Sequence, residues 1–361
     1  MSRGYNFSAG PSTLPESVLR RAQEEMLEWG GERASVLEVS HRGKAFVALN
    51  DKLEADLRRL LEVPADYTVL FLQGGATQHF AQIPMNLAGP DDSADYLISG
   101  HWATKAHAEA RTLVKTNVVA TGEAGKFTSI PEHSQWKLTP GAAYLHVTPN
   151  ETIQGVEFAG VPEVGDVPVV ADMSSNILSR PVDVSRYGLI YAGAQKNMGA
   201  AGLTLLVIRN DLLARKRRPL PNIFTYAAHA KEKSLLNTPP TFAFYITALV
   251  LEWIDAQGGL AAMEKLNRAK ADMLYAAIDG SNGYYANPVD ARYRSRMNVP
   301  FTLHDAALDE AFLVESKAAG LLTLKGHKAV GGMRASIYNA MPIAGVQALV
   351  GFMGDFAKRH G

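Results

Sequence analysis

Short apolar runs alternate with helical or turn segments between residues 13 and 210. The runs lie at 67–72, 95–99, 116–121, 142–148, 167–172, 187–194 and 202–208. Most are close to continuously apolar, which is typical of strands that are covered on both faces of a sheet. The pattern therefore predicts an α/β fold whose large domain is built on a mostly parallel sheet, with helices on both faces.

Two helical segments frame the start of this region. Residues 13–29 begin with Thr13 and Glu16 at the spacing of a capping box, with Pro15 in the first turn. Residues 76–88 read as a second helix, directly after the first apolar run. The sequence predicts that both helices pack against the sheet.

The pattern changes after residue 240. A long helical segment, 242–278, is interrupted near Gly258 and Gly259. It is followed by a predicted strand, helix, strand and helix at 294–303, 308–321, 326–338 and 342–359. We therefore expect a large domain over residues 16–258 and a smaller C-terminal α+β domain over residues 1–15 and 259–361.

Composition excludes several classes of function. Lys plus Arg and Asp plus Glu both number 36, so no overall basic field exists to recruit nucleic acid or an anionic membrane. The chain has no cysteine, which excludes disulfides, thiolate metal sites and cysteine nucleophiles. It has no secretory signal at its N-terminus and no apolar run near the roughly 20 residues that span a bilayer. We expect a cytoplasmic protein with no bound metal and no nucleic-acid or membrane partner.

Three features follow predicted strands and can meet at one edge of the sheet. Asp172 ends one run, Lys196 follows the next, and the Gly-rich segment "QGGATQ" follows the first. A Gly-rich turn that leads into a helix can bind an anion, although it can equally be a plain strand-to-helix turn. Dinucleotide and P-loop motifs are absent: there is no G-x-G-x-x-G, and neither Gly-Lys pair precedes Ser or Thr.

Together these features match what pyridoxal phosphate requires. Its aldehyde needs an amine for a Schiff base, its phosphate needs anion-binding donors, and its ring nitrogen needs a carboxylate. Trp102, after the run at 95–99, offers an aromatic face for the ring. Taken singly, Asp172 reads better as a turn residue and Lys196 as a surface lysine. Their joint occurrence at strand ends favours the cofactor site.

Longer motifs add a family resemblance. "FSAGPSTLP", "EVSHRGKAF", "FLQGGAT", "HVTPNETIQG", "ADMSSNILSRPVDVSRYGLIYAGAQKNMG" and "GHKAVGGMRASIYNAMP" resemble the phosphoserine aminotransferase family over residues 6 to about 350. The resemblance implies a class V aminotransferase of the pyridoxal-phosphate fold-type I architecture, working as a homodimer. It also implies transfer of an amino group between glutamate and 3-phosphohydroxypyruvate, giving phosphoserine and 2-oxoglutarate in serine biosynthesis. In many bacteria an analogous reaction, on 4-phosphohydroxythreonine, serves pyridoxal phosphate (pyridoxine) biosynthesis.

The resemblance implies roles around the cofactor. Lys196 in "AQKN" would form the Schiff base, and Asp172 would pair with the ring nitrogen. Trp102 would stack on the ring, and Thr152 in "NETIQG" would contact the cofactor near its phenolic oxygen.

The cofactor phosphate would be held by residues from two subunits. The residues that match this role within the subunit are Ala76, Thr77 and Gln195. Asn237 and Thr238 in "LLNTPPTF" match the segment that reaches the phosphate across the dimer. Each active site would thus be shared between subunits.

The implied substrate residues are basic. Arg334 suits the α-carboxylate, because a guanidinium fork binds a carboxylate bidentately. His41, Arg42, His327 and Lys328 would form the pocket for the substrate phosphate. Without the resemblance, exposed loop charges would be the ordinary reading of these four.

The chain departs from some relatives at two places. Lys328 stands where some carry Arg, which keeps the charge but loses the bidentate fork. Ala76 and Thr77 stand where some carry an Arg in the Gly-rich loop, which leaves backbone amides to bind the cofactor phosphate.

Two alternatives remain open from sequence. One is another fold-type I aminotransferase, such as the alanine–glyoxylate type, which the basic phosphate pocket disfavours. A cysteine desulfurase is disfavoured because the chain has no cysteine. The other alternative is a non-catalytic pyridoxal-phosphate-binding protein, against which the presence of both Lys196 and Arg334 argues.

Overall fold

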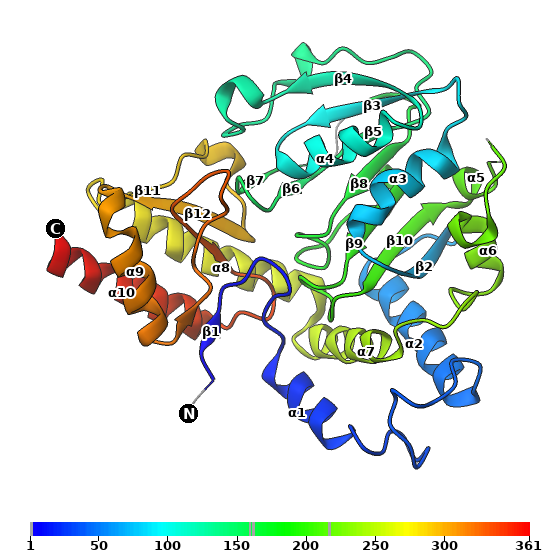
Figure 1. Cartoon of the computed structure of the whole chain (residues 1–361), viewed down its shortest axis with the longest axis horizontal. Coiled ribbons are helices and arrows are strands. Elements are labelled where there is room, and N and C mark those ends of the chain that lie inside the picture. The colour runs from blue at the N-terminus through cyan, green and yellow to red at the C-terminus, as the bar shows by residue number, and fades with distance from the viewer. Residues whose placement is uncertain (1–2, 159, 161–162, 216–217) are drawn as a thin grey trace.

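The computed structural model describes residues 3–158, 160, 163–215 and 218–361, and it is built around a seven-stranded sheet (Figure 1). In spatial order the strands are β2 (Tyr67–Gln73), β10 (Leu203–Arg209), β9 (Leu189–Gly193), β8 (Val169–Asp172), β5 (Leu145–Val147), β3 (Ser93–Ile98) and β4 (Lys115–Thr121). All seven correspond to the apolar runs, so this prediction is confirmed.

The sheet is parallel except for one strand. β10 runs antiparallel to both of its neighbours, β2 and β9, and every other adjacent pair is parallel. Because β2 and β9 are both antiparallel to β10, they share one direction. Six strands therefore end at the same edge, which is where an open α/β sheet places its ligands. The predicted mostly parallel sheet is confirmed.

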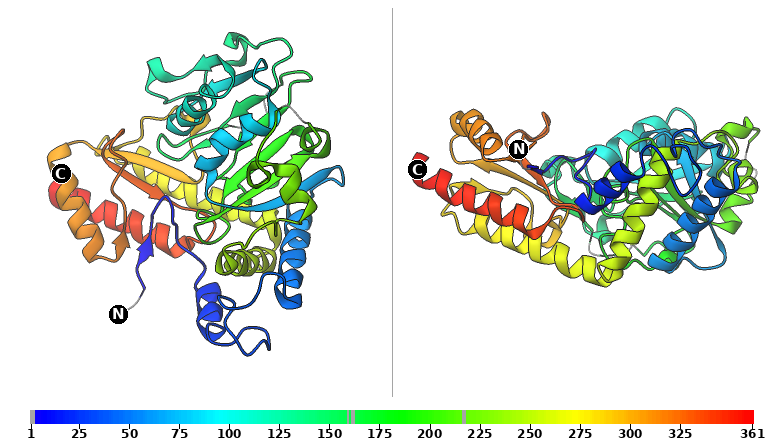
Figure 2. Two further views of the ribbon diagram at one scale, coloured as in Figure 1. Left: turned by 45° about the vertical axis from the view of Figure 1, so that its right-hand side comes forward. Right: turned by 90° about the horizontal axis from the view of Figure 1, so that it is seen from below.

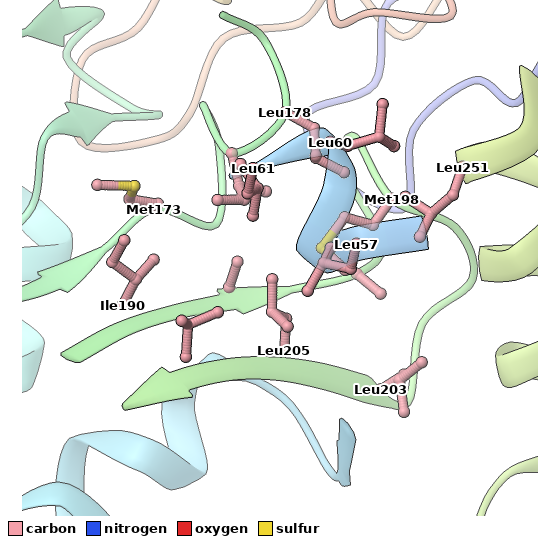
Figure 3. Close-up of a cluster of buried hydrophobic side chains, with 14 of the residues drawn as sticks. Leu57, Leu60, Leu61, Met173, Leu178, Ile190, Met198, Leu203, Leu205 and Leu251 are labelled. Atoms are coloured by element: carbon pink, nitrogen blue, oxygen red, sulfur yellow. The ribbon is translucent and has the colours of Figure 1, made fainter. Parts of the chain in front are cut away.

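Helices cover both faces of the sheet. On one face lie α2 (Lys44–Leu60) and α7 (Thr241–Ala256), and on the other α3 (Ala76–Leu87) and α4 (His101–Ala110). Side chains of β10 alternate between two buried clusters: Leu205 packs under α2, and Leu206 packs under α3. Figure 3 shows the first cluster, with Leu57 of α2 over Leu205. The short helices α5 (Asn210–Leu213) and α6 (Tyr226–Lys231) follow β10.

The C-terminal elements lie beside the sheet (Figure 2). Their side chains form a third buried cluster. These elements comprise the helices α8 (Gly259–Asp279), α9 (Asp309–Ala318) and α10 (Ile343–His360) and a small sheet of β11 (Tyr285–Ala286), β12 (Asn298–Leu303) and β14 (Met333–Ser336). The N-terminal β1 (Tyr5–Asn6) joins them by pairing in parallel with β13 (Leu321–Leu322). The first residues of the chain therefore pack with its last hundred. The division at residues 16 and 258 stays a prediction.

The predicted break in the long helical segment is confirmed, because α7 ends at Ala256 and α8 begins at Gly259. Gly258 has φ of +97° and Gly259 has φ of +73°, the left-handed region that glycine adopts without strain. The two helices can therefore diverge within two residues. α7 stays against the large sheet, and α8 crosses to the C-terminal elements.

Two local predictions are wrong. No capping box forms at Thr13: α1 (Glu16–Glu24) begins after Pro15 without a side-chain cap, and the Thr13 hydroxyl instead accepts a hydrogen bond from Arg3 at 3.4 Å. The predicted strand at 326–338 is a strand only over β14. Its first half is a loop closed by the Gly326 N–H, which donates to the Gly332 carbonyl at 2.8 Å.

Candidate active site

A cavity lies at the edge where the parallel strands end. It brings together seven of the residues predicted for the cofactor: Ala76, Thr77, Trp102, Thr152, Asp172, Gln195 and Lys196. These come from the turns after β2, β3, β8 and β9 and from a small hairpin, β6 (Asn150–Glu151) and β7 (Val156–Glu157). The topology therefore places the N-terminus of α3, one indole ring and two ionisable side chains around the same space.

Lys196 follows β9 and reaches into this cavity. Its Nζ donates to Thr152 Oγ1 at 2.7 Å, the one hydrogen bond of this amine among the described residues. Burial lowers the pKa of Lys196 to about 8, although the carboxylate of Asp172 opposes that shift. A useful fraction of the amine is then unprotonated near neutral pH, as a nucleophilic or proton-transferring lysine requires.

The N-terminal segment holds the backbone of Lys196 from the other side. The Ser12 hydroxyl donates to the Lys196 carbonyl, and the Ser12 N–H donates to the Gln195 carbonyl at 2.9 Å. Gly10 has φ of +142°, and a Cβ there would lie 3.4 Å from Lys196 Cγ. The turn that carries the lysine is therefore clamped between the sheet and residues 10–12.

Asp172 is the last residue of β8 and is buried. Its Oδ1 accepts hydrogen bonds from the N–H and the hydroxyl of Ser174, at 2.9 and 2.6 Å. Burial raises the pKa of Asp172, while Ser174 and the charge of Lys196 lower it. Tyr191 also acts on this carboxylate, and a buried carboxylate can accept a further hydrogen bond from a cationic N–H in the cavity.

The turn after β2 is shaped for an anion. Gly74 has φ of +95°, and Gly75 caps α3 without a side-chain hydrogen bond. The first turn of α3 carries no acidic residue, so the N–H groups of Ala76 and Thr77 remain for a ligand. Gln195 closes this corner with a buried side-chain oxygen that has no partner in the described part of the chain.

Trp102 forms an aromatic wall of the cavity. It lies in the first turn of α4, and Lys196 Nζ is 5.8 Å from the centroid of its ring. Phe80 of α3 packs at 6.5 Å on the indole and backs it. The arrangement leaves an aromatic face toward the cavity.

Glu151 is a site residue that sequence reasoning missed. It is 0% exposed, and its carboxylate accepts the N–H groups of Trp102 and Ala103, both at 2.9 Å. It thus caps α4 and ties it to the hairpin that carries Thr152. Burial raises its pKa to about 7, against the lowering effect of those two N–H groups. The available signal was a carboxylate directly before Thr152 in "NETI".

The basic residues of the 326–338 segment lie next to the cavity. The charge of Arg334 contributes to lowering the pKa of Lys196 and of His327. Arg334 Nε is buried without a hydrogen-bond partner in the described residues. The ring of His327 lies 5.5 Å from that of His101, the first residue of α4, at an interplanar angle of 53°. A carboxylate on the substrate could satisfy Arg334 beside Lys196.

Seven predicted residues are absent from the lining of this cavity. Three of them, His327, Lys328 and Arg334, belong to the neighbouring basic segment, and the other four are His41, Arg42, Asn237 and Thr238. Arg42 and Thr238 are exposed, while His41 Nε2 and Asn237 Oδ1 are buried without a partner among the described residues. It remains a prediction that these four residues complete the active site of a second subunit.

Comparison with known proteins agrees with this geometry. The family model of aminotransferase class-V matches residues 4–349. The phosphoserine aminotransferase of Stenotrophomonas maltophilia (strain R551-3) is 56% identical over 361 residues, covering 100% of both chains. That of Xanthomonas campestris pv. campestris (strain B100) is 55% identical, also over 100% of both. Fold and site thus define a class-V aminotransferase.

Solved structures indicate which family of class-V aminotransferases the chain resembles. The phosphoserine aminotransferase of Bacillus circulans subsp. alkalophilus superposes with a TM-score of 0.97 at 45% identity, covering 99% of each chain. The PLP-bound enzyme from Trichomonas vaginalis has a TM-score of 0.94 at 43% identity, covering 98% of this chain and 100% of that one. The chain belongs to the phosphoserine aminotransferase family.

A more distant structure shows the fold alone. The alanine–glyoxylate aminotransferase from Nostoc sp. has a TM-score of 0.73 at 18% identity, covering 98% of this chain and 96% of that one.

Among the described residues, no helix is long and apolar enough to cross a membrane.

Proposed function

We propose that this protein binds pyridoxal phosphate and transfers an amino group between glutamate and 3-phosphohydroxypyruvate, giving phosphoserine and 2-oxoglutarate. The observation that carries the proposal is the meeting of Lys196, Asp172 and the α3 anion cradle in one cavity. Full-length similarity to phosphoserine aminotransferases supports it.

The residues present fit the cofactor. The cradle at Ala76 and Thr77 suits a phosphate, Trp102 suits the ring face, and buried Asp172 suits a cationic ring nitrogen. When bound, pyridoxal phosphate supplies a reactive aldehyde carbon and a ring that withdraws electrons from the substrate. Asn237 and Thr238 of the second subunit would complete the binding site for the cofactor phosphate.

Lys196 and Asp172 would each control one proton of the reaction. Lys196, as a free amine near its pKa of about 8, would move the proton between the substrate Cα and the C4′ carbon that the cofactor supplies. Thr152 orients the amine through its 2.7 Å hydrogen bond. Asp172 would hold the proton on the ring nitrogen, because a buried carboxylate favours a cation beside it.

Arg334, His327 and Lys328 orient the substrate. Arg334, with its unpartnered Nε, would hold the α-carboxylate next to Lys196. His327 and Lys328 would bind the substrate phosphate together with His41 and Arg42 of a second subunit. This arrangement also fits 4-phosphohydroxythreonine, which we include as an additional substrate of the same site.

We further propose a cytoplasmic homodimer with shared active sites. Leu27 is 88% exposed and Leu37 58% exposed, in the segment that leads to His41 and Arg42. Exposed apolar side chains at such a place are suited to burial against another chain.

An absorbance spectrum of the purified protein tests the proposal. The protein should be yellow, and phosphoserine or glutamate should convert its visible band to that of the pyridoxamine form. Borohydride reduction before substrate is added should fix the cofactor to Lys196, as peptide mass analysis would show. Fixation to another lysine would overturn the assignment.

A further inference from the structure

His101 sits between the cofactor cavity and the basic 326–332 loop. It is the first residue of α4, next to Trp102. Its ring centroid lies 5.4 Å from that of Trp102, at an interplanar angle of 88°, and 5.5 Å from that of His327. The imidazole therefore bridges the aromatic wall of the cavity and the loop that carries Lys328.

The imidazole nitrogens of His101 have no hydrogen-bond partner among the described residues. Its backbone N–H donates to Gln154 Oε1 at 3.2 Å, but its ring nitrogens make no hydrogen bond within the described part of the chain. Both are available to a ligand. A protonated imidazole donates from both nitrogens, which suits phosphate oxygens.

The charges around His101 are mainly positive. Lys105 faces it from α4, and His327 and Lys328 face it from the loop, with Arg334 of β14 behind His327. No ion pair joins any of these residues to a carboxylate among the described residues. Burial lowers the pKa of His101, and the cations around it lower it further.

The nearest carboxylates do not neutralise this group. Glu151 of β6 uses its oxygens on the N–H groups of Trp102 and Ala103. The lining of the adjacent groove contains one carboxylate, Glu123, together with Lys126 and His107. A cationic group without an acidic partner is stabilised by an anion, and a phosphate dianion matches its charge.

We propose that His101 is a further phosphate-binding residue of this active site, acting with His327 and Lys328 and favouring phosphorylated substrates when it is protonated. The inference rests on the proposed function, since it assigns the group that recognises the substrate phosphate. His101 adds a donor where Lys328 lacks the fork of an arginine. A bound dianion would raise the pKa of His101, so phosphate binding would take up a proton and weaken as the pH rises.

Steady-state kinetics of His101→Asn test this role. Asn keeps a donor of similar size but cannot carry the charge. At pH 6 we expect the KM for phosphoserine to rise about tenfold, with the KM for glutamate changed less than about twofold. The difference from the unsubstituted protein should shrink as the pH is raised to 8, because fewer phosphate complexes then carry a protonated imidazole.

His107→Asn is the matched control. His107 lies on the same helix and lines the same groove, but its Nε2 is 3.0 Å from Thr116 Oγ1 and it does not contact His327. This variant should retain both KM values. Equal losses for phosphoserine and glutamate in His101→Asn, or an unchanged KM for phosphoserine at pH 6, would overturn the inference.

A direct readout uses the unsubstituted holoenzyme. In NMR pH titrations of protein with isotope-labelled histidine, the pKa of His101 should rise when inorganic phosphate or phosphoserine is added. No rise would also overturn the inference.

Lys328→Ala separates the two proposals. If Lys328→Ala weakens phosphoserine binding selectively while His101→Asn does not, the proposed function stands and the role of His101 is wrong. If the unsubstituted holoenzyme fails to convert phosphoserine, the proposed function itself is wrong.

Discussion

Two lysines among the described residues have a pKa that is lowered by burial, and they have different environments. Lys196 opens onto the cavity and donates one hydrogen bond, to Thr152. Lys270 of α8 is 0% exposed and donates to the carbonyls of Ile337, Tyr338 and Met341, at 3.0, 2.7 and 3.0 Å. Burial lowers the pKa of Lys196 to about 8 and that of Lys270 to about 7.

The difference shows what separates a reactive lysine from a structural one. An ammonium group has three donors, and Lys270 uses all of them on backbone carbonyls. It therefore fixes the turn after β14, whose Tyr338 hydroxyl donates to the Ala9 carbonyl at 2.8 Å. Lys196 keeps donors free and faces a space where a ligand fits. If the lowered pKa were the only criterion for a reactive lysine, Lys270 would be chosen before Lys196.

The largest effect should come from Lys196→Ala. Transamination should fall roughly 10⁴-fold or more, because the group that moves the substrate proton is gone. The melting temperature should stay close to that of the unsubstituted protein, since the amine has only one hydrogen bond to lose. Single-turnover kinetics and thermal unfolding measure the two quantities. A variant that loses its fold along with its activity would contradict a catalytic role.

Lys270→Met should show the opposite pattern. Three buried carbonyls lose their donor, so the free energy of unfolding should fall by about 3 kcal/mol or more. The molecules that remain folded should keep their kcat, because Lys270 is not in the cavity lining. Denaturant titration gives the stability. Unchanged stability would mean that the three hydrogen bonds contribute little.

Asp172→Asn should act on Lys196 and leave Lys270 unchanged. Turnover should fall roughly 10²-fold, about 2.7 kcal/mol, because the ring nitrogen loses the charge that keeps it protonated. The pKa of Lys196 should also fall below about 8, since Asp172 is the main group that raises it. Retention of the cofactor by absorbance is the control. Near-normal rates would contradict the assignment of Asp172.

The smallest effect concerns chemical labelling of the cofactor-free protein. An amine reacts when it is unprotonated, so reductive methylation of Lys196 should increase as pH rises through about 8. Lys270 should stay unlabelled over the same range, although its pKa is about 7, because the ammonium is enclosed. Mass spectrometry of peptides measures both sites. Faster labelling at Lys270 would reverse the comparison.

The sheet and most of the cofactor cavity could be predicted from sequence, because their signals are local. The apolar runs predict the strands, and residues at the ends of parallel strands must meet at one edge. Asp172 and Lys196 are of this kind. The family resemblance supplied residues such as Thr152, whose role no local pattern shows.

The rest depends on contacts between distant segments. Glu151 acts on α4, Lys270 acts on residues 337–341, and His101 meets the 326–332 loop. No periodicity encodes such pairings. No capping box forms at Thr13 because α1 begins only at Glu16, with Pro15 at its N-cap, so that Thr13 lies two residues before the cap position. The role of His41 and Arg42 cannot be read from one chain at all, since their proposed site lies on another.

The parallel pairing of β1 with β13 has a consequence for synthesis. Tyr5 emerges from the ribosome first, yet its partner Leu321 is made more than three hundred residues later. The segment from residue 7 to residue 12, which clamps Lys196, is anchored by that pairing and by Ser336 and Tyr338. Contacts this distant in sequence form late, because loop closure must be paid for before they stabilise anything. The lysine turn therefore gains its last support only when translation is nearly complete, and nascent chains shorter than about 340 residues should lack it.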